Sequence, residues 1–235
     1  PNQDRCWDRG LILYRQILKE TISSFSPDLI HVHYLNKLAL LPLFFEQPYI
    51  LTPWGSDLLQ NLPRHTNVFK KMMHRSMRTA NAIISDTKSL LNYCGDQGAR
   101  RLFHVPFGVD AHWLDLNIDR FAIRHKLGFS PQEKVILSSR ALTPFYRIHE
   151  IIEHLIPLFE SDSDYRLLIL KFNEDVVYLK KIQDQLHALG LHKKVRFYKV
   201  EHRDELPSIY KASDVLVSAA TTDGVPATFF EAMAM

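Results

Sequence analysis

The sequence predicts an α/β protein with two Rossmann-like parallel-sheet domains, and three observations lead to this prediction. Short apolar runs alternate with longer helical patterns along the 235 residues. These runs are continuous rather than alternating in polarity, which is typical of strands covered on both faces. No Asn-Gly turns of the kind that connect hairpins separate them. Strands that alternate with helices favour parallel sheets.

The first half of the chain is predicted to contain four helices and four strands. The helices are expected at 11–25, 35–45, 66–77 and 87–97, and the strands at 28–33, 49–54, 82–86 and 103–107. The second half repeats the pattern, with a helical segment after each strand. Its strands are expected at 135–140, 166–172, 195–200 and 215–220. Between the two halves of the chain, the apolar periodicity is lost near Gly128 and Pro131. We therefore expect domains over 1–115 and 133–235, joined by a linker over 116–132.

Composition excludes several classes of protein. Hydrophobic residues make up 46% and charged residues 23%, which argues against collagen, low-complexity and disordered chains. Lys and Arg number 29 against 26 Asp and Glu, a balance too near neutral to indicate nucleic-acid binding. The apolar run over 38–45 is far shorter than the roughly 20 residues that cross a bilayer.

Two further observations concern compartment and completeness. Cys6 and Cys94 are far apart and show no metal-ligand spacing. With no pattern of a signal peptide, we expect a cytoplasmic protein. The chain starts at Pro1, and its last apolar helix pattern reaches Met235 without a stop signal. We therefore expect both domains to be incomplete.

Polar residues follow several predicted strands. In open parallel sheets, ligands bind outside the carboxyl ends of the strands. His33, Asp57, Arg140 and the segment 218–223 occupy such positions. If the carboxyl edges of the two domains face each other, these residues surround one cleft.

The strongest local pattern is the run from Asp223 through Gly224, Val225 and Pro226 to Glu231. Proline suits the first turn of a helix, and the free N–H groups of that turn favour a bound anion. Glu231 is expected roughly 7–8 Å further along the helix axis. Two carboxylates so spaced suit hydroxyls at separate points of a sugar-containing ligand. The alternative is an Asp that caps the helix and a solvated Glu.

Asp223-x7-Glu231 resembles the Glu-x7-Glu motif of family 4 (group 1) retaining glycosyltransferases, which have the GT-B fold. Asp stands here in the first position. Further segments resemble the family in the same order. They are PDLIHVH (27–33), TPWGSD (52–57), ISDTKSLLNYCGDQGA (84–99), HVPFGVD (104–110), LSSRALTPFYRIHEIIEHL (137–155) and VRFYKVEHRDELPSIYKASDVLVS (195–218). The resemblance implies an acceptor-side N-terminal domain and a nucleotide-sugar-binding C-terminal domain that face each other across a cleft.

The resemblance also implies roles for residues of the C-terminal domain. Glu231 would hold the ribose of a nucleotide-sugar donor, Asp223 would contact the transferred sugar, and residues 224–226 would line the donor site. Arg140 would neutralise the diphosphate, a task that suits a guanidinium because it stays charged. The family usually has a Lys shortly afterwards, where this chain has Tyr146. Arg147 beside it either supplies that second charge or is a solvated residue at a helix start.

The acceptor side carries fewer signals. His33 and Asp57 are candidate acceptor-side residues, although Asp57 could equally cap the following helix. Trp54 stands where the family often has a His. His31 and His33 share a strand face, as a metal pair would, but the family needs no metal and no cofactor beyond the donor. Asp162–Ser163–Asp164 has the form of a metal-binding motif of another glycosyltransferase fold. It precedes a strand, and we therefore expect a polar loop there.

The segment 58–85 contains no acidic residue. Its cations are Arg64, Lys70, Lys71, Arg75 and Arg78, and its apolar stripe is Val68, Phe69, Met72, Met73 and Met77. Such a helix either lies on an anionic membrane surface or packs its stripe against the sheet and leaves a solvated basic face.

The resemblance thus implies a metal-independent transfer of sugar from a nucleoside diphosphate sugar to an acceptor hydroxyl, with retention. The acceptor is expected to be a glycan or a lipid-linked molecule of polysaccharide or glycolipid biosynthesis. Peripheral contact with an anionic membrane is the partner that the basic segment 58–85 would add. A nucleotide-sugar 2-epimerase and a non-catalytic sugar-nucleotide-binding subunit are the alternatives.

Overall fold

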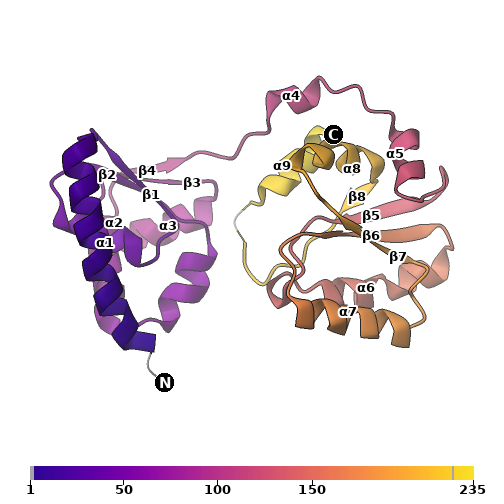
Figure 1. The fold of residues 1–235 in the computed structure, drawn as a ribbon, viewed down its shortest axis with the longest axis horizontal. Coiled ribbons are helices and arrows are strands. Elements are labelled where there is room, and N and C mark those ends of the chain that lie inside the picture. The colour runs from indigo at the N-terminus through magenta and orange to yellow at the C-terminus, as the bar shows by residue number, and fades with distance from the viewer. Residues whose placement is uncertain (1–2, 224) are drawn as a thin grey trace. The chain divides into compact units, whose positions relative to one another are not determined.

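The computed structural model describes residues 3–223 and 225–235, and side chains from residue 13 onward. The described chain forms two compact units (Figure 1). The N-terminal unit extends to Phe107 and also includes Thr222–Val225, and the C-terminal unit comprises Gly108–Thr221 and Pro226–Met235. Each unit has its own parallel four-stranded sheet, which confirms the predicted fold class.

The N-terminal unit alternates helices and strands as the sequence predicts. Its sheet has the order β1-β2-β3-β4. Its strands are β1 (Ile30–His33), β2 (Tyr49–Thr52), β3 (Ala82–Ser85) and β4 (Leu102–His104), and its helices are α1 (Gln3–Phe25), η1 (Lys37–Phe44), η2 (Asp57–Asn61), η3 (Leu62–Arg64), α2 (Asn67–Thr79) and α3 (Lys88–Asp96).

The core of this unit lies between its sheet and the helices that follow the strands. Leu51 of β2 and Ile83 of β3 pack with Met73 and Met77 of α2, and both methionines are fully buried. Phe69 and Met72 are partly buried against the same cluster. Four of the five stripe residues of α2 therefore face the protein, because they fall on one side of an amphipathic helix. Only Val68 is largely exposed.

The C-terminal unit has the sheet order β7-β6-β5-β8. Its strands are β5 (Lys134–Ser138), β6 (Tyr165–Lys171), β7 (Val195–Lys199) and β8 (Val215–Leu216), and its helices are α4 (Ala111–Leu114), α5 (Arg120–Lys126), η4 (Pro144–Tyr146), α6 (Ile148–Ser161), α7 (Val176–Ala188), η5 (Arg203–Glu205), α8 (Leu206–Ala212) and α9 (Ala227–Ala234). In Figure 1, α6 and α7 cover one face of this sheet, and α8 and α9 cover the other.

Strand alternation explains why both faces of this sheet are buried. Ile136 of β5 and Leu167 of β6 pack into the core with α6 and α7. Their chain neighbours Leu137 and Leu168 point to the other face and pack with α8. Successive side chains of a strand point to opposite faces, so a continuous apolar run fills two cores at once.

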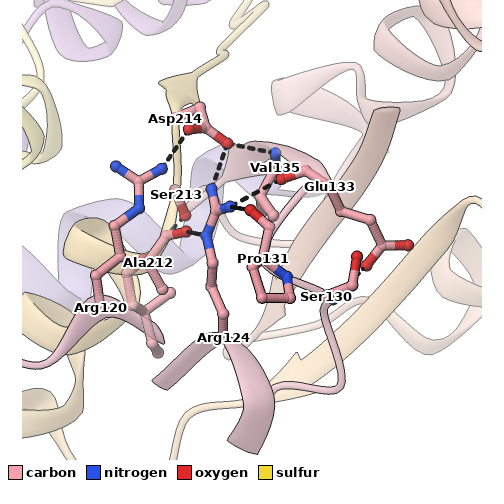
Figure 2. Close-up of polar contacts among 10 residues, drawn as sticks. Arg120, Arg124, Ser130, Pro131, Glu133, Val135, Ala212, Ser213 and Asp214 are labelled. Atoms are coloured by element: carbon pink, nitrogen blue, oxygen red, sulfur yellow. Dashed lines mark hydrogen bonds and ion pairs between the residues drawn. The ribbon is translucent and has the colours of Figure 1, made fainter. Parts of the chain in front are cut away.

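The segment predicted as a linker differs from the prediction. Within 116–132 the chain forms α5, whose Arg124 is only 3% exposed. Figure 2 shows the Arg124 guanidinium donating to the carbonyls of Ala212, Pro131 and Glu133 at 2.8–3.1 Å and to Asp214 at 2.5 Å. Asp214 also pairs with Arg120. These contacts join α5 to the turn after α8 and to the start of β5.

Two other elements differ from the prediction. The helix expected over 35–45 is a 3-10 helix that contains Pro42, which has no N–H to donate. The strand expected over 215–220 is paired with β5 only at Val215 and Leu216. Within the described residues, no helix is long and apolar enough to cross a membrane.

Candidate donor site of a glycosyltransferase

Arg140 lies just beyond the carboxyl end of β5. Its Nη1 donates to Thr228 Oγ1 on α9 at 3.2 Å, and its guanidinium carbon lies 4.4 Å from the ring centroid of Tyr146. A cation over an aromatic face is electrostatically favourable, and a stacked guanidinium has a defined plane. Tyr146, which stands where the family usually has a Lys, thus orients the charge of Arg140 and adds no second charge.

Glu231 lies one helical turn beyond Thr228 on α9 and is buried, with 6% of its surface exposed. Its Oε2 accepts a hydrogen bond from the Tyr210 hydroxyl of α8 at 2.9 Å. Its Oε1 accepts one from Arg203 Nη2 at 3.1 Å. Each carboxylate oxygen keeps further acceptor capacity for a ligand hydroxyl. The alternative of a merely solvated helix Glu does not fit this burial.

The hydroxyl of Tyr210 is a stable donor to Glu231. Burial raises the pKa of Tyr210, and the neighbouring Glu231 carboxylate raises it further. The phenol therefore keeps its proton at ordinary pH. The sequence analysis did not identify Arg203 and Tyr210. They precede their partner Glu231 by 28 and 21 positions, and no local pattern marks contacts over such separations.

Arg147 is engaged with a neighbour on its own helix. It adopts a left-handed backbone conformation at the start of α6, with φ of 51°. Its guanidinium donates to Glu150 Oε1 at 2.7 Å and also contacts Oε2. Hydrogen bonding with Arg147 lowers the pKa of the Glu150 carboxyl, which keeps the pair ionised. This geometry favours the alternative that Arg147 is a helix-start residue.

The loop before α9 carries the remaining donor-side candidates. Asp223 is exposed, and Pro226 is the residue immediately before the first helical residue. Asp223 is three residues too early to cap the helix, so the capping alternative does not hold. The Pro226 carbonyl accepts the N–H of Phe229 at 2.9 Å. Val225 is partly buried, and Gly224 lies outside the described residues.

Asp57 and His33 belong to the N-terminal unit. The Asp57 side chain is 1% exposed, and it accepts the N–H groups of Leu35 at 2.7 Å, Trp54 at 3.1 Å and Leu58 at 2.9 Å. Asp57 is itself the first residue of η2, and the residue at the capping position is Ser56, so Asp57 does not cap this helix as the alternative supposed. Its buried carboxylate instead holds the loops after β1 and β2. His33, by contrast, ends β1 and is exposed.

The other motifs have ordinary structural surroundings. His31 Nε2 contacts Thr52 Oγ1 at 2.8 Å, and burial lowers the pKa of His31, with a smaller effect of His33. No group of three or more metal-binding side chains occurs among the described residues. Asp162 precedes β6 and pairs with Lys134 at 2.7 Å, so it lies at the amino edge of the sheet as predicted.

Comparisons with known proteins bear on the family and the fold. Residues 119–235 match the family described as "Glycosyl transferases group 1", and residues 3–87 match "Glycosyl transferase 4-like". Mannosylfructose-phosphate synthase of Agrobacterium fabrum is 28% identical over 167 residues, which make up 67% of this chain and 36% of that protein. The chain thus spans about a third of the length of this curated relative.

Solved structures share the fold. Anabaena HepE in complex with UDP has a TM-score of 0.74 at 18% identity, over 93% of this chain and 60% of its own. Sucrose-phosphate synthase from Thermosynechococcus elongatus has a TM-score of 0.76 at 15% identity, over 99% of this chain and 60% of its own. The two parallel-sheet units have the fold of these proteins, and the chain belongs to the group 1 family of glycosyltransferases.

Proposed function

We propose that the protein transfers a sugar from a nucleoside diphosphate sugar to an acceptor hydroxyl, with retention and without a metal. The C-terminal unit would bind the donor, and the N-terminal unit would receive the acceptor. The observation that supports this most is that Arg140 and Glu231 both lie at α9, one helical turn apart. A charged guanidinium contacts α9 one turn before a buried carboxylate that is held by two donors.

The reaction has one difficult step, the departure of the diphosphate. The bond between the anomeric carbon and the β-phosphate oxygen breaks, and the acceptor oxygen forms a bond to that carbon on the same face. The acceptor proton passes to the leaving phosphate. Arg140 would stabilise the charge that develops there, since a fixed cation is most effective at a position where charge appears during the reaction. Asp223 would contact the transferred sugar.

The physiological setting remains part of the proposal. By their names, two of these similar proteins are synthases of mannosylfructose phosphate and sucrose phosphate, and the third was solved in complex with UDP. For this protein we propose a cytoplasmic reaction in polysaccharide or glycolipid synthesis, with a glycan or lipid-linked acceptor.

Calorimetry with UDP, GDP and ADP on the full-length protein tests the donor site. Arg140→Ala should weaken binding of the preferred nucleotide about 10- to 150-fold, the equivalent of about 1.5–3 kcal/mol for a charge-assisted contact. Arg196→Ala is the matched control, because Arg196 is an exposed arginine near the amino end of β7. Unchanged affinity in Arg140→Ala would refute the assignment. Tight nucleotide binding without sugar transfer to any acceptor would instead indicate a binding subunit.

A further inference from the structure

Three aromatic rings gather at the carboxyl edge of the N-terminal unit's sheet. His33 ends β1, Trp54 follows β2 by two residues, and Phe107 follows β4 by three. The ring centroids of His33 and Trp54 are 6.3 Å apart, and those of Trp54 and Phe107 are 5.6 Å apart. Trp54 is 47% exposed and Phe107 is 37% exposed. We refer to these three rings as the aromatic platform.

The backbone that carries Trp54 is fixed even though its ring is exposed. The Trp54 N–H donates to both oxygens of the buried Asp57 carboxylate at 3.1 Å. Gly55 follows with φ of 101°, a conformation that glycine adopts without strain. Asp57 also holds the N–H of Leu35, so one carboxylate ties the loop after β1 to the loop after β2.

A second set of contacts holds the same loops. Tyr34 directly follows β1 and has φ of 66°, which is costly for a residue with a large side chain. Its hydroxyl lies 3.2 Å from Ser56 Oγ and accepts from Asn61 Nδ2 at 2.8 Å. Backbone strain of this kind persists where the surroundings impose it, and it concentrates at ligand sites. The protein therefore holds an exposed tryptophan in a defined position.

We propose that the aromatic platform binds the pyranose ring of a carbohydrate acceptor; this inference rests on the proposed glycosyltransferase function and deepens it. A pyranose has an apolar face of C–H groups and a rim of hydroxyls. The negative face of an aromatic ring attracts polarised C–H groups. The His33 imidazole is itself a polar member of the platform and can hydrogen-bond to the hydroxyl rim.

The chemistry of the platform argues for a sugar ring rather than an acyl chain. His33 is one of its three rings, and the ring of its neighbour His31 lies tilted against it at a centroid distance of 4.0 Å. Polar imidazoles within the ring set reduce the apolar surface available to a lipid tail. Sugars, by contrast, combine apolar contact with hydrogen bonding over the same few ångströms.

Saturation-transfer NMR on the full-length protein tests the proposal, with methyl α-D-glucopyranoside, methyl α-D-mannopyranoside and methyl β-D-galactopyranoside as probes. At least one pyranoside should receive saturation at its ring C–H protons from irradiated aromatic resonances. Glycerol, a polyol without a ring face, should receive much less. Trp54→Ala should weaken the pyranoside affinity at least fivefold, and Trp54→Tyr should restore most of it. Phe121→Ala is the control, because Phe121 is an exposed ring on α5.

Calorimetry with UDP on the same variants separates this proposal from the proposed function. If Trp54→Ala weakens pyranoside binding and leaves UDP affinity unchanged, the platform is supported. Equal pyranoside binding by wild type, Trp54→Ala and Phe121→Ala overturns the platform even when UDP binds normally. A parallel loss of UDP affinity in Trp54→Ala also overturns it, since Trp54 would then act on the donor. Pyranoside binding without any nucleotide binding supports the platform and refutes the proposed function.

Discussion

Glu231 is a carboxylate with one hydrogen-bond donor of its own unit on each oxygen, and this sets how it responds to substitution. Tyr210 holds Oε2 and Arg203 holds Oε1, so the carboxyl plane is fixed before any ligand arrives. Preorganisation of this kind reduces the ordering cost of binding. A glutamine at this position would have one oxygen and one NH₂ group. The NH₂ group cannot accept a hydrogen bond, so the contact with either Arg203 or Tyr210 would be lost.

The two carboxylates of the motif should respond differently to amide substitution. Glu231→Gln should weaken binding of free nucleoside diphosphate about tenfold or more, because its proposed partner is the ribose and hydrogen bonds to charged groups contribute about 1.5–3 kcal/mol. Asp223→Asn should leave that affinity nearly unchanged and lower kcat, because its proposed partner is the transferred sugar. Calorimetry and steady-state kinetics on both variants check this. Equal losses of nucleotide affinity would contradict the division of roles.

The sequence identified only part of the donor-side site. Arg140 and Glu231 are visible because each sits at a position defined by a strand end or a motif. The partners that orient them, Tyr146, Tyr210 and Arg203, became clear only from the structure. Tyr146 acts through stacking, and the other two act across 21 and 28 residues of chain. Such long-range pairs depend on how α8 and α9 pack, which no local spacing encodes.

At the scale of elements, α5 is anchored by Asp214. Burial alone would raise the pKa of Asp214, but the Val135 N–H and the charges of Arg124 and Arg120 outweigh it and lower that pKa. A lowered pKa means that the folded state favours the ionised carboxylate. The resulting stability is present above the ordinary pKa near 3.8 and is lost as the pH falls through the folded-state value.

Asp214→Asn should therefore lower the stability of the C-terminal unit at pH 7. We expect a loss of about 2–3 kcal/mol, less than the 3–5 kcal/mol of a fully buried pair because Asp214 is partly exposed. The loss should shrink as the pH falls below the ordinary pKa of about 3.8 toward the lowered folded-state pKa, where the wild-type carboxylate becomes protonated as well. Thermal melts between pH 3 and 7 measure this, with Asp184→Asn on the exposed face of α7 as the control. A loss that is independent of pH would contradict the proposed charge pairing.

The structure narrows the prediction for α2. Its stripe packs inward through Met73 and Met77, so a membrane could contact only its basic face and the exposed Val68. Among the described side chains, Lys70, Lys71, Arg75 and Arg78 form no ion pair with an acidic residue. Burial lowers the pKa of His74, and the charges of Arg78 and Lys70 lower it further, which indicates a concentrated positive field.

Binding to vesicles should therefore be electrostatic and sensitive to salt. Each basic residue near an anionic surface contributes roughly 1 kcal/mol, screened over about 8–10 Å at ordinary ionic strength. Replacing Lys70, Lys71 and Arg75 with Gln should reduce sedimentation with phosphatidylserine vesicles at low salt and leave phosphatidylcholine vesicles unaffected. Replacing Lys180 and Lys181 of α7 with Gln is the matched control. Failure of the wild type to sediment with anionic vesicles at low salt would mean that the basic face is simply solvated.

Element boundaries show which signals are local. All eight predicted strands are present, because a buried strand in a parallel sheet is a continuous apolar run. The predicted linker over 116–132 contains the helix α5, which the sequence analysis did not anticipate. This short helix is held by the contact of Arg124 with Asp214, which lies 90 positions later in the chain. The strand after Ser213 is shorter than its apolar run. Its residues pair with β5 at Val215 and Leu216, and the last hydrogen bond to β5 is from the Val217 N–H to the Leu137 carbonyl. Apolar composition thus predicts strands better than it predicts where their pairing stops.

At the scale of the whole molecule, the described chain contains two units with separate hydrophobic cores. One core surrounds Leu51 and Met73 in the N-terminal unit, and the others flank β5 and β6 in the C-terminal unit. Units with their own cores unfold as separate cooperative transitions unless their interface is large and apolar. A ligand stabilises only the unit that it binds.

Differential scanning calorimetry should therefore resolve two transitions that respond to different changes. A nucleoside diphosphate at 100 times its Kd should stabilise the C-terminal unit by about 2.7 kcal/mol and raise only its transition. Asp214→Asn should lower that same transition. Met73→Ala removes a fully buried side chain from the core of the N-terminal unit. It should destabilise that unit by about 2–5 kcal/mol and lower the melting temperature of the N-terminal transition alone. A single transition that moves with all three changes would show that the units unfold together, and the assignment of the donor to one unit would then need evidence other than thermal shifts.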